Sequence, residues 1–291
     1  MIHAKHIAKP SRKAILIGCP GEGDNYLYSV ATDIQNVKTF LTSSRGGKWK
    51  SNEIITLDYP DLTAVASVLQ NTIADYSFIY FAGHGYETVN DRMICLNGTD
   101  VSDLFLLDQN PRQLIILDCC REKEYAVISG IPKDDEWFHF DGRYPERDAF
   151  DLAILQSPPG KKIVHATKSG FASWECKKGR GGVFTTSLLL STRSFQNELP
   201  YASLKIEKLL QKAKDIIIQS GDDQEPEIVH SEGNLQVPFA LYIKTEPKPA
   251  LSQNFSRNQP RRTFKRETSN SGLLKVGLFF LALAIIAEHS E

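Results

Sequence analysis

The sequence lacks a large net charge, paired cysteines and a leading apolar segment, and each absence excludes a class of protein. Its 34 basic and 35 acidic residues give a net charge of −1, so no overall field draws it toward nucleic acid or strongly acidic partners. The five cysteines are odd in number and free of zinc-type spacing, which fits a reducing compartment better than a disulfide framework. Residues 1–12 are polar, and the apolar run after them is too short for a secretory signal. We therefore expect a cytoplasmic protein that does not bind nucleic acid.

What the chain does have is enough apolar material for a real core, arranged as alternating strands and helices. It is 291 residues long and 41% hydrophobic, which suits one large domain or two small ones. Short apolar runs alternate with stretches of helical period or with long loops, a pattern that favours a mainly parallel sheet covered on both faces. The fold class is therefore α/β. The expected strands are 13–19, 54–57, 77–81, 113–117, 163–166 and 235–243, and the expected helices are 28–41, 62–73, 184–190 and 204–218.

Two of the expected strands end in residues that carry chemistry. The strand 77–81 is followed by Ala82, Gly83 and His84, and the strand 113–117 is followed by Asp118-Cys119-Cys120-Arg121. Active-site groups of such sheets collect at the carboxyl ends of the strands. If the two strands are neighbours, a thiol and an imidazole lie side by side, which is the minimum for nucleophilic catalysis by cysteine.

Seven stretches of the sequence carry a resemblance to a known family. They are AGHG at 82–85, LIILDCCRE at 114–122, RKAILIG with LYSVATDIQNVKTFL, IVHATKSGFASWE at 163–175 with GGVFTTSLL, and QEPEIV at 224–229. With them, the chain over about residues 11–243 resembles the caspase-like cysteine peptidases, and the metacaspases and paracaspases more than the animal caspases. The resemblance implies a caspase-like α/β/α sandwich with a mainly parallel central sheet. A peptidase domain over 1–245 would comprise a large-subunit-like region (about 11–125), a linker loop (about 121–160) and a small-subunit-like region (about 161–245).

The resemblance also implies roles for individual residues. Cys120 matches the nucleophile and His84 the general base, and the backbone N–H groups of Gly85 and Cys120 would form the oxyanion hole. We interpret Cys119 as a packing residue, with tuning of redox sensitivity as the alternative. No third side chain of a triad can be named, because the family usually orients its histidine through the backbone.

Substrate preference is predicted from acidic residues. In the metacaspase and paracaspase pattern, Asp118 and an acid in the first helix, here Asp33, line the pocket for the residue before the scissile bond. Two carboxylates repel a third and favour arginine or lysine. The alternatives are a helix-surface acid at Asp33 and a capping or turn role for Asp118. Ala172 stands where some relatives carry another acid, with Glu175 three residues on, which leaves open a weaker or differently shaped basic pocket.

The linker loop raises two further expectations. Loops this long tend to be functional, and a peptidase that prefers Arg or Lys would find sites for cutting itself here. An acidic triplet in the same loop, Asp134-Asp135-Glu136, would bind calcium as in many metacaspases, but we favour a solvated turn because no EF-hand pattern is present. We therefore expect no cofactor. The basic residues of the loop are Arg121, Lys123, Lys133, Arg143, Arg147, Lys161 and Lys162.

The C-terminal tail differs in composition from the rest. Residues 246–272 are rich in proline, serine, asparagine and basic residues, which predicts a flexible linker. Residues 273–287 are apolar apart from Lys275, predicting a short helix below the ~20 residues needed to cross a bilayer. A membrane anchor that holds the domain on the cytoplasmic face, an interfacial or partner-binding helix, and a helix folded back onto the domain all remain open.

The resulting hypothesis is a cysteine endopeptidase of the caspase or metacaspase type that cleaves protein substrates after Arg or Lys. The family would imply a role in regulated cell death or defence, with an activating protein or a homo-oligomer as a further partner. The chief alternative is a catalytically weak scaffold that recruits partners and meets a membrane through its tail. A redox role for Cys119 and Cys120 is disfavoured because adjacent cysteines form strained disulfides. The run GCPGEG lacks the lysine and hydroxyl of a phosphate loop.

Overall fold

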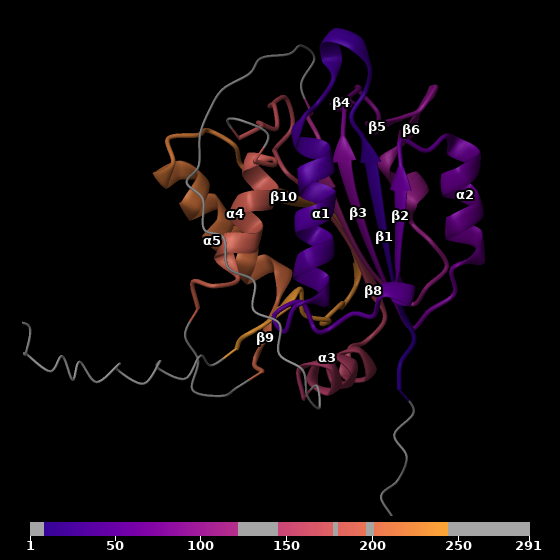
Figure 1. The fold of residues 1–291 in the computed structure, drawn as a ribbon, viewed down its shortest axis with the longest axis vertical. Coiled ribbons are helices and arrows are strands. Elements are labelled where there is room, and N and C mark those ends of the chain that lie inside the picture. The colour runs from indigo at the N-terminus through magenta and orange to yellow at the C-terminus, as the bar shows by residue number, and fades with distance from the viewer. Residues whose placement is uncertain (1–8, 122–144, 177–179, 196–200, 244–291) are drawn as a thin grey trace, which may run out of the picture. The chain divides into compact units, whose positions relative to one another are not determined.

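The computed structural model describes residues 9–121, 145–176, 180–195 and 201–243, which belong to one compact unit, Met1–Glu246. A six-stranded sheet in the order β10-β8-β7-β3-β1-β2 forms its centre (Figure 1). Every neighbouring pair is parallel except β10 with β8. The six strands are β1 (Arg12–Cys19), β2 (Ile54–Asp58), β3 (Tyr76–Gly83), β7 (Arg112–Asp118), β8 (Gly160–His165) and β10 (Glu227–Gly233).

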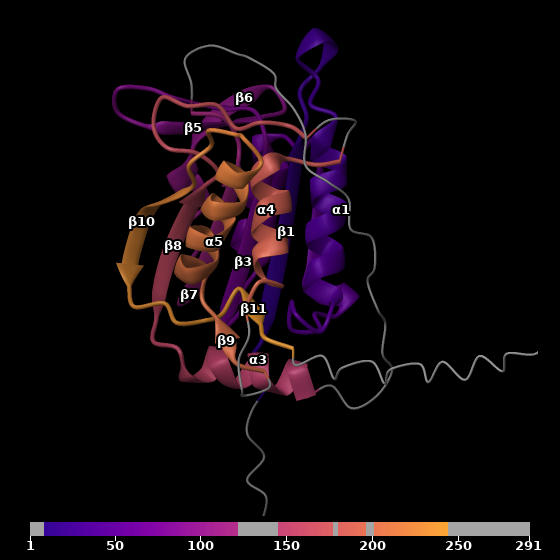
Figure 2. The same ribbon diagram turned by 90° about the vertical axis from the view of Figure 1, so that its left-hand side faces the viewer.

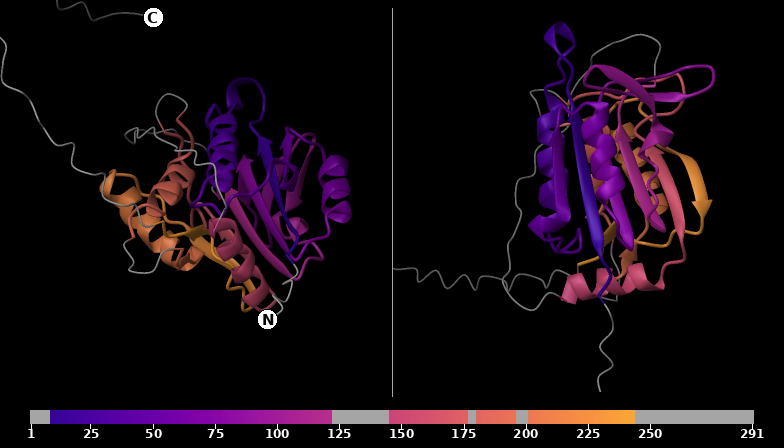
Figure 3. Two further views of the ribbon diagram at one scale, coloured as in Figure 1. Left: turned by 60° about the horizontal axis from the view of Figure 1, so that its bottom comes forward. Right: turned by 90° about the vertical axis from the view of Figure 1, so that its right-hand side faces the viewer.

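Helices cover the two faces of this sheet. On one face lie α1 (Ser29–Thr42), α4 (Val183–Ser191) and α5 (Ile206–Gln219), seen in front of the sheet in Figure 2. On the other face lies α2 (Leu62–Asn71), which stands in front in the right-hand view of Figure 3. The expected α/β/α sandwich with a mainly parallel sheet is confirmed.

The strands divide their side chains between two cores. Ala14 and Leu16 of β1 belong to the core on the α1 side, whereas Ile15 and Ile17 belong to the core on the α2 side. Because successive side chains of a strand point to opposite faces, a sheet covered on both sides needs apolar residues at every position. This explains why the continuous apolar runs in the sequence predicted the inner strands β1, β3 and β7 correctly.

The strand order also fixes where a site can form. β1 and β3 are neighbours, but the chain leaves β1 for β2 at the edge and returns over α2 to β3. Such a reversal opens a crevice beyond the carboxyl ends of the two strands. The 3₁₀ turn η1 (Gly23–Asn25) lies in the loop after β1, and His84 follows β3 directly.

Several elements were not expected. A separate three-stranded antiparallel sheet is formed by β4 (Gly85–Glu87), β5 (Arg92–Leu96) and β6 (Thr99–Ser102), followed by the 3₁₀ turn η3 (Asp103–Leu106). The helix α3 (Pro145–Gln156) lies inside the segment treated as a linker loop. The expected last strand 235–243 is wrong: the sixth strand of the sheet is β10 at 227–233, and 235–243 contains only the short β11 (Ala240–Leu241), which pairs with β9 (Ser203–Leu204). These elements are short or weakly patterned, so sequence periodicity does not reveal them.

A buried ionic cluster fastens α3 beneath the sheet, at the end opposite the carboxyl ends of the parallel strands (Figure 2). Arg12, the first residue of β1, donates from Nη2 to the carbonyl oxygens of Gly47 at 2.7 Å and Lys48 at 3.1 Å. It pairs with Glu53 of the 3₁₀ turn η2 (Ser51–Glu53) and with Asp151 of α3. The cluster thus joins the first strand, the segment before β2 and the helix α3.

Some predictions concern residues outside the described ranges. These are the linker and apolar helix of the tail (246–272 and 273–287), the acidic triplet Asp134-Asp135-Glu136 and the basic residues Lys123, Lys133 and Arg143. No helix in the described part of the chain is long and apolar enough to cross a membrane.

Candidate active site

The neighbouring ends of β3 and β7 bring His84 and Cys120 to the same edge of the sheet. The parallel pairing of these strands runs to Ala82 opposite Asp118. His84 lies two residues beyond Ala82, and Cys120 lies two residues beyond Asp118, so the chain arrives at both residues at the same level. The expectation that the two strands are sheet neighbours is confirmed.

His84 is held by the loop that follows β1. Its Nε2 lies 2.6 Å from the carbonyl oxygen of Asn25. A carbonyl oxygen can only accept a hydrogen bond, so Nε2 carries the proton and donates it, and in the neutral ring Nδ1 is left as the acceptor. The contact therefore sets both the tautomer and the orientation of the imidazole through a backbone group, as the family resemblance implies.

Gly21 lets the same loop approach the imidazole closely. Its φ is +76°, and a Cβ at this position would lie 2.8 Å from both Cδ2 and Nε2 of His84. A glycine is required here both for the left-handed backbone and for the missing side chain. The ring of His84 is thus positioned by its contact with the Asn25 carbonyl oxygen and by the close approach of the loop at Gly21.

Cys120 is half-buried, and its thiol lies against the backbone of Ser173, in the loop after β8. The Ser173 N–H points at Cys120 Sγ at 3.4 Å, and the thiol donates to the Ser173 carbonyl oxygen at 3.5 Å. A backbone N–H is a strong hydrogen-bond donor, and here it is directed at the sulfur. The cysteine therefore has a polar setting at the sheet edge.

Cys119 is in a different environment from Cys120. It is 2% exposed and belongs to the core on the α2 side. Burial raises the pKa of its thiol well above the ordinary value, with a smaller contribution from Cys120. A Cβ at Gly85 would lie 2.8 Å from Cys119 Sγ and 2.8 Å from the Met93 carbonyl oxygen. Cys119 is thus a packing residue, as expected, and it supports the close approach of the chain at Gly85.

Asp33 and Asp118 come together beside Gly182, the residue before α4. The Gly182 N–H lies 2.9 Å and 2.8 Å from the two carboxylate oxygens of Asp33. A Cβ on Gly182 would lie 2.5 Å from Asp118 Oδ2 and 3.2 Å from Asp33 Oδ2. Both acids are buried, at 1% and 7% exposed. Asp33 is therefore not a helix-surface acid, and that alternative interpretation of the residue is wrong.

Asp118 has an organised set of donors of its own. Its Oδ1 accepts from Ser173 Oγ at 2.6 Å, and its Oδ2 accepts from Thr185 Oγ1 at 2.6 Å and Thr185 N at 3.2 Å. Because Thr185 lies in the first turn of α4, Asp118 also serves as a cap for that helix. Asp118 therefore both caps α4 and lies beside Asp33 at Gly182.

Burial raises the pKa of both carboxyl groups, and repulsion from a neighbouring carboxylate adds to it. Burial raises the pKa of Asp33 well above its ordinary value, and the charge of Asp118 raises it further, against the hydrogen bond from Gly182. Burial likewise raises the pKa of Asp118, against the hydrogen bonds from Ser173 and Thr185. Two buried acids with raised pKa values, one of which shares Ser173 as a partner with Cys120, are typical of a functional site rather than of a structural ion pair.

Glu175 is the third acid of this group. It is half-buried, and its Oε1 accepts from the Ser29 N–H, at the start of α1, at 2.8 Å. Its charge contributes to the raised pKa values of both Asp33 and Asp118. Glu175 thus adds negative charge to the acidic cluster while it caps α1.

Sequence reasoning missed the groups that support these residues. The carbonyl oxygen of Asn25 and the N–H groups of Ser173 and Gly182 act through the backbone, so residue type carries no signal for them. Gly21 gave a faint signal as part of a glycine-rich loop. Thr185 was seen only as part of an expected helix. The site therefore combines predicted side chains with backbone partners that the folded chain supplies.

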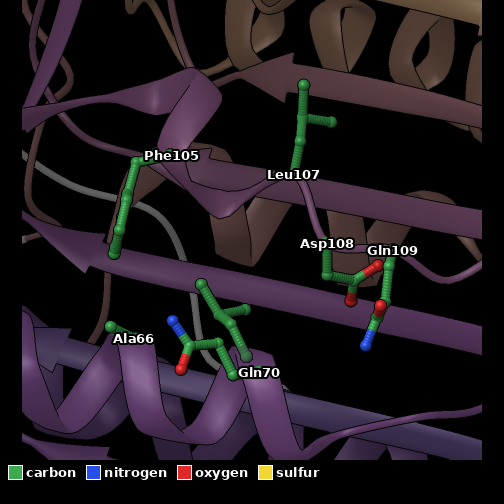
Figure 4. Close-up of a pocket in the computed structure, with 7 residues that line it drawn as sticks. Ala66, Gln70, Phe105, Leu107, Asp108 and Gln109 are labelled. Carbon is green, nitrogen blue, oxygen red and sulfur yellow. The ribbon is translucent and has the colours of Figure 1, made fainter.

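A separate hollow lies away from this site (Figure 4). It has a volume of about 340 Å³ and is lined by Ala66, Leu69, Gln70, Phe105, Leu107, Asp108 and Gln109. Asp108 and Gln109 precede β7. The hollow therefore faces the amino end of β7, opposite the end that carries Cys120.

Fold and site together define a member of a cysteine peptidase family. The family model described as the caspase domain matches residues 11–236, and the chain belongs to that family. Among solved structures it is similar to caspase-1 from Spodoptera frugiperda, at 15% identity over 76% of this chain and 86% of that one, with a TM-score of 0.49. No curated protein matches this chain.

Proposed function

We propose that the chain is a cysteine endopeptidase that hydrolyses peptide bonds after Arg or Lys. The observation that carries the proposal is the placement of Cys120 and His84 at adjacent strand ends, with two buried acids, Asp118 and Asp33, next to them. A thiol and an imidazole supply the reaction. The acids supply the preference for a basic side chain.

The reaction begins with acylation of the cysteine. The Cys120 thiol gives its proton to Nδ1 of His84, and the sulfur attacks the carbonyl carbon of the scissile bond. The backbone N–H groups of Gly85 and Cys120 stabilise the oxyanion that forms, where preorganised donors have their largest effect. His84 then protonates the leaving amine, and a thioester remains on Cys120.

Hydrolysis of the thioester completes the cycle. His84 takes a proton from water, the hydroxide attacks the thioester carbonyl carbon, and the sulfur leaves as a thiolate that recovers the proton from the imidazolium. The Nε2–H of His84 stays bonded to Asn25 throughout, which keeps Nδ1 directed at the reacting atoms. A general base must be in hydrogen-bond reach of the proton that it moves, and this contact supports that reach.

The acidic cluster supports the preference for a basic residue before the scissile bond. Each oxygen of Asp33 and Asp118 already accepts from the chain, but a carboxylate has about four acceptor positions and can take further donors. A guanidinium or ammonium group adds positive charge beside carboxyl groups whose pKa values are raised by burial first and by neighbouring carboxylates second. A substrate carboxylate would add to that repulsion.

The finer parts of the proposal rest on the sequence alone. They are a cytoplasmic location, a role in regulated cell death or defence, processing within the linker loop, and attachment to a membrane through residues 273–287. Calcium binding at Asp134, Asp135 and Glu136 is less favoured than a solvated turn, and an activating protein or self-association is the proposed partner.

The proposal is tested with short fluorogenic peptides that end in Arg, Lys, Asp or citrulline, which matches Arg in shape without its charge. Arg and Lys peptides are expected to be cleaved, and Arg is expected to exceed citrulline in kcat/KM by about 10- to 100-fold, the value of a charged hydrogen bond of about 1.5–3 kcal/mol. Preference for Asp would refute the pocket argument. No cleavage of any peptide after addition of calcium or after self-association would favour the scaffold alternative.

Asp118→Asn sharpens this test, because it removes one charge and keeps the shape. We expect the advantage of Arg over citrulline to shrink about tenfold or more in the variant. In the wild type, the negative charge is present only above the raised pKa values of Asp33 and Asp118. KM for the Arg peptide should therefore rise as pH falls through a range above the ordinary aspartate value, while KM for citrulline changes little.

The role of the loop after β1 gives a separate prediction. Gly21→Ala places a methyl group against His84 and is expected to lower kcat for the Arg peptide about 10-fold or more, because a displacement of about 1 Å at a catalytic group costs up to about 100-fold. Gly23→Ala is the matched control, since Gly23 has a φ of +58° in the same loop and nothing within 4 Å of its Cβ position. Equal losses of kcat in both variants would contradict the positioning role of Gly21.

A further inference from the structure

The residue that follows Cys120 is a buried arginine with several partners. Arg121 is 4% exposed, and its Nη2 donates to Glu87 Oε1 at 2.8 Å. Its Nη1 donates to the Thr167 carbonyl oxygen at 3.2 Å and pairs with Glu227 of β10. A planar guanidinium can hold such a divergent set of acceptors, which an ammonium group cannot.

The backbone of Arg121 is held as firmly as its side chain. Its N–H donates to the Phe171 carbonyl oxygen at 3.0 Å, and its carbonyl oxygen accepts from the Gly170 N–H at 3.2 Å. The chain just after Cys120 is thereby fixed to the loop that also carries Ser173. The side chain of Arg121 leaves this fixed point and reaches toward β4.

Glu87 connects this arginine to the other half of the site. It is the last residue of β4, the strand that begins at Gly85, immediately after His84. One ion pair therefore joins the residue after Cys120 to the strand that follows His84. The side chain of Glu87 is 22% exposed and that of Arg121 is 4% exposed, so water screens the pair far less than it would a surface pair.

The position of this ion pair matters because the backbone pairing of the two strands stops short of the site. The ladder between β3 and β7 ends at Ala82 and Asp118, two residues before His84 and Cys120. The small sheet holds Gly85 from the other side, opposite Ile94 of β5. Between the two chain segments, the Arg121–Glu87 pair spans the gap that the ladder leaves.

We propose that the Arg121–Glu87 ion pair is a positioning contact that sets the placement of His84 and Gly85 relative to Cys120. The inference rests on the proposed peptidase function, which gives Cys120 and His84 their roles. Neither Arg121 nor Glu87 takes part in the reaction. Loss of the pair leaves each catalytic group in place on its own strand and loosens their mutual alignment.

The test uses Glu87→Gln, which keeps the shape of the side chain and removes its charge, and Arg121→Lys, which keeps the charge and loses the planar fork. Both are expected to lower kcat for the Arg peptide by about 10- to 100-fold, as misplacement of a catalytic group does. KM is expected to stay within about threefold, because the acidic cluster is unchanged. Glu225→Gln is the matched control, since Glu225 pairs with Lys168 and Lys214, and it is expected to keep kcat within about twofold.

A second measurement is independent of peptide cleavage. The rate of alkylation of Cys120 by iodoacetamide is followed against pH, because it reports the thiolate fraction that the neighbouring imidazole sustains. The midpoint is expected to move toward the value of an unassisted thiol, about 8.5, in Glu87→Gln and Arg121→Lys but not in Glu225→Gln.

The two measurements separate the possible failures. Unchanged kcat and an unchanged alkylation midpoint in both variants would overturn the positioning role. A fall in kcat that parallels a fall in thermal stability, with the midpoint unchanged, would overturn it as well, because it would show a merely structural contact. If the wild type cleaves no peptide, the proposed function fails, and the alkylation midpoint alone still decides whether the ion pair aligns the thiol and the imidazole.

Discussion

Replacing Cys120 by alanine is expected to abolish cleavage of Arg and Lys peptides, with kcat reduced about 10⁴-fold or more, the scale seen when a peptidase loses its nucleophile. Cys119→Ala is expected to keep kcat within about tenfold, because its sulfur is buried in the core and points toward Gly85 rather than toward the exposed edge. Truncation of a buried sulfur should cost about 1 kcal/mol of the free energy of unfolding. Kinetics of both variants and denaturant unfolding measure these effects.

Labelling of the native protein with iodoacetamide at neutral pH checks the same assignment without a substrate. Burial raises the pKa of Cys19 to about 12, of Cys95 to about 12 and of Cys176 to about 11, and it raises that of Cys119 further above its ordinary value. A thiol is alkylated as the thiolate, so these four should react slowly. Mass spectrometry should find one rapidly modified site, Cys120. Equal loss of activity in the two alanine variants, or rapid labelling of Cys119, would undo the assignment.

Replacing Arg12 by methionine is expected to lower the free energy of unfolding by about 3–5 kcal/mol, the usual cost of removing one partner from a buried ionic cluster. Burial lowers the pKa of Arg12 to about 10, so the side chain is still charged at neutral pH. It neutralises Glu53 and Asp151 together with Arg147, and it lies over the rings of Trp49 at 4.7 Å and Phe150 at 5.2 Å. Methionine keeps the apolar part of the arginine side chain but makes none of these polar contacts.

Lys13→Met is the control for this stability measurement, because it changes the charge at the next position of the same strand. Lys13 donates from Nζ to the Asn52 carbonyl oxygen at an exposed site, so its loss should change the free energy of unfolding by no more than about 0.5 kcal/mol. Denaturant titrations of both variants give the comparison. A loss below about 1 kcal/mol for Arg12→Met would show that the cluster contributes little net stability, as buried ion pairs sometimes do when water replaces the missing partner.

The inner strands of the central sheet could be predicted because they are short and apolar at nearly every position, whereas the edge strand β10 (Glu227–Gly233) is only partly buried and was not expected. β1, β3 and β7 are buried almost throughout, and each run in the sequence showed this without interruption. The helix α5 was equally clear, with Ile206, Leu209, Ala213 and Ile217 on one buried face, which is the spacing of an amphipathic helix.

The elements around the sheet could not be predicted in the same way. β4, β5 and β6 are three to five residues long and only partly buried, so they show neither a strict alternation nor an apolar run. The helix α3 mixes buried Arg147 and Asp151 with buried Phe150 and Ile154. Charged residues on a buried face hide the apolar stripe that predicts a helix, because their burial depends on partners distant in the chain, Glu53 for Arg147 and Arg12 for Asp151.

In the candidate site, too, some residues could be predicted from the sequence and others could not. Cys120, His84 and Gly85 were predicted from two strand ends and a family resemblance, and Asp33 and Asp118 from the family pattern. The structure brings the two acids together at Gly182 and ties His84 to Asn25. The roles of Asn25, Ser173 and Gly182 come from backbone groups, which every residue possesses, so their importance depends on where the fold puts them.

By itself, the sequence determined the α/β class and the side chains that stand at the ends of the inner strands. These properties follow from short-range patterns, since apolar periodicity and residue chemistry are local. The tertiary structure alone decided which backbone carbonyl holds the imidazole, which backbone groups lie against the Cys120 thiol, and that Arg121 reaches Glu87. Each of these depends on contacts between segments 34 or more residues apart, and no local pattern encodes the direction in which a side chain points after the chain has folded.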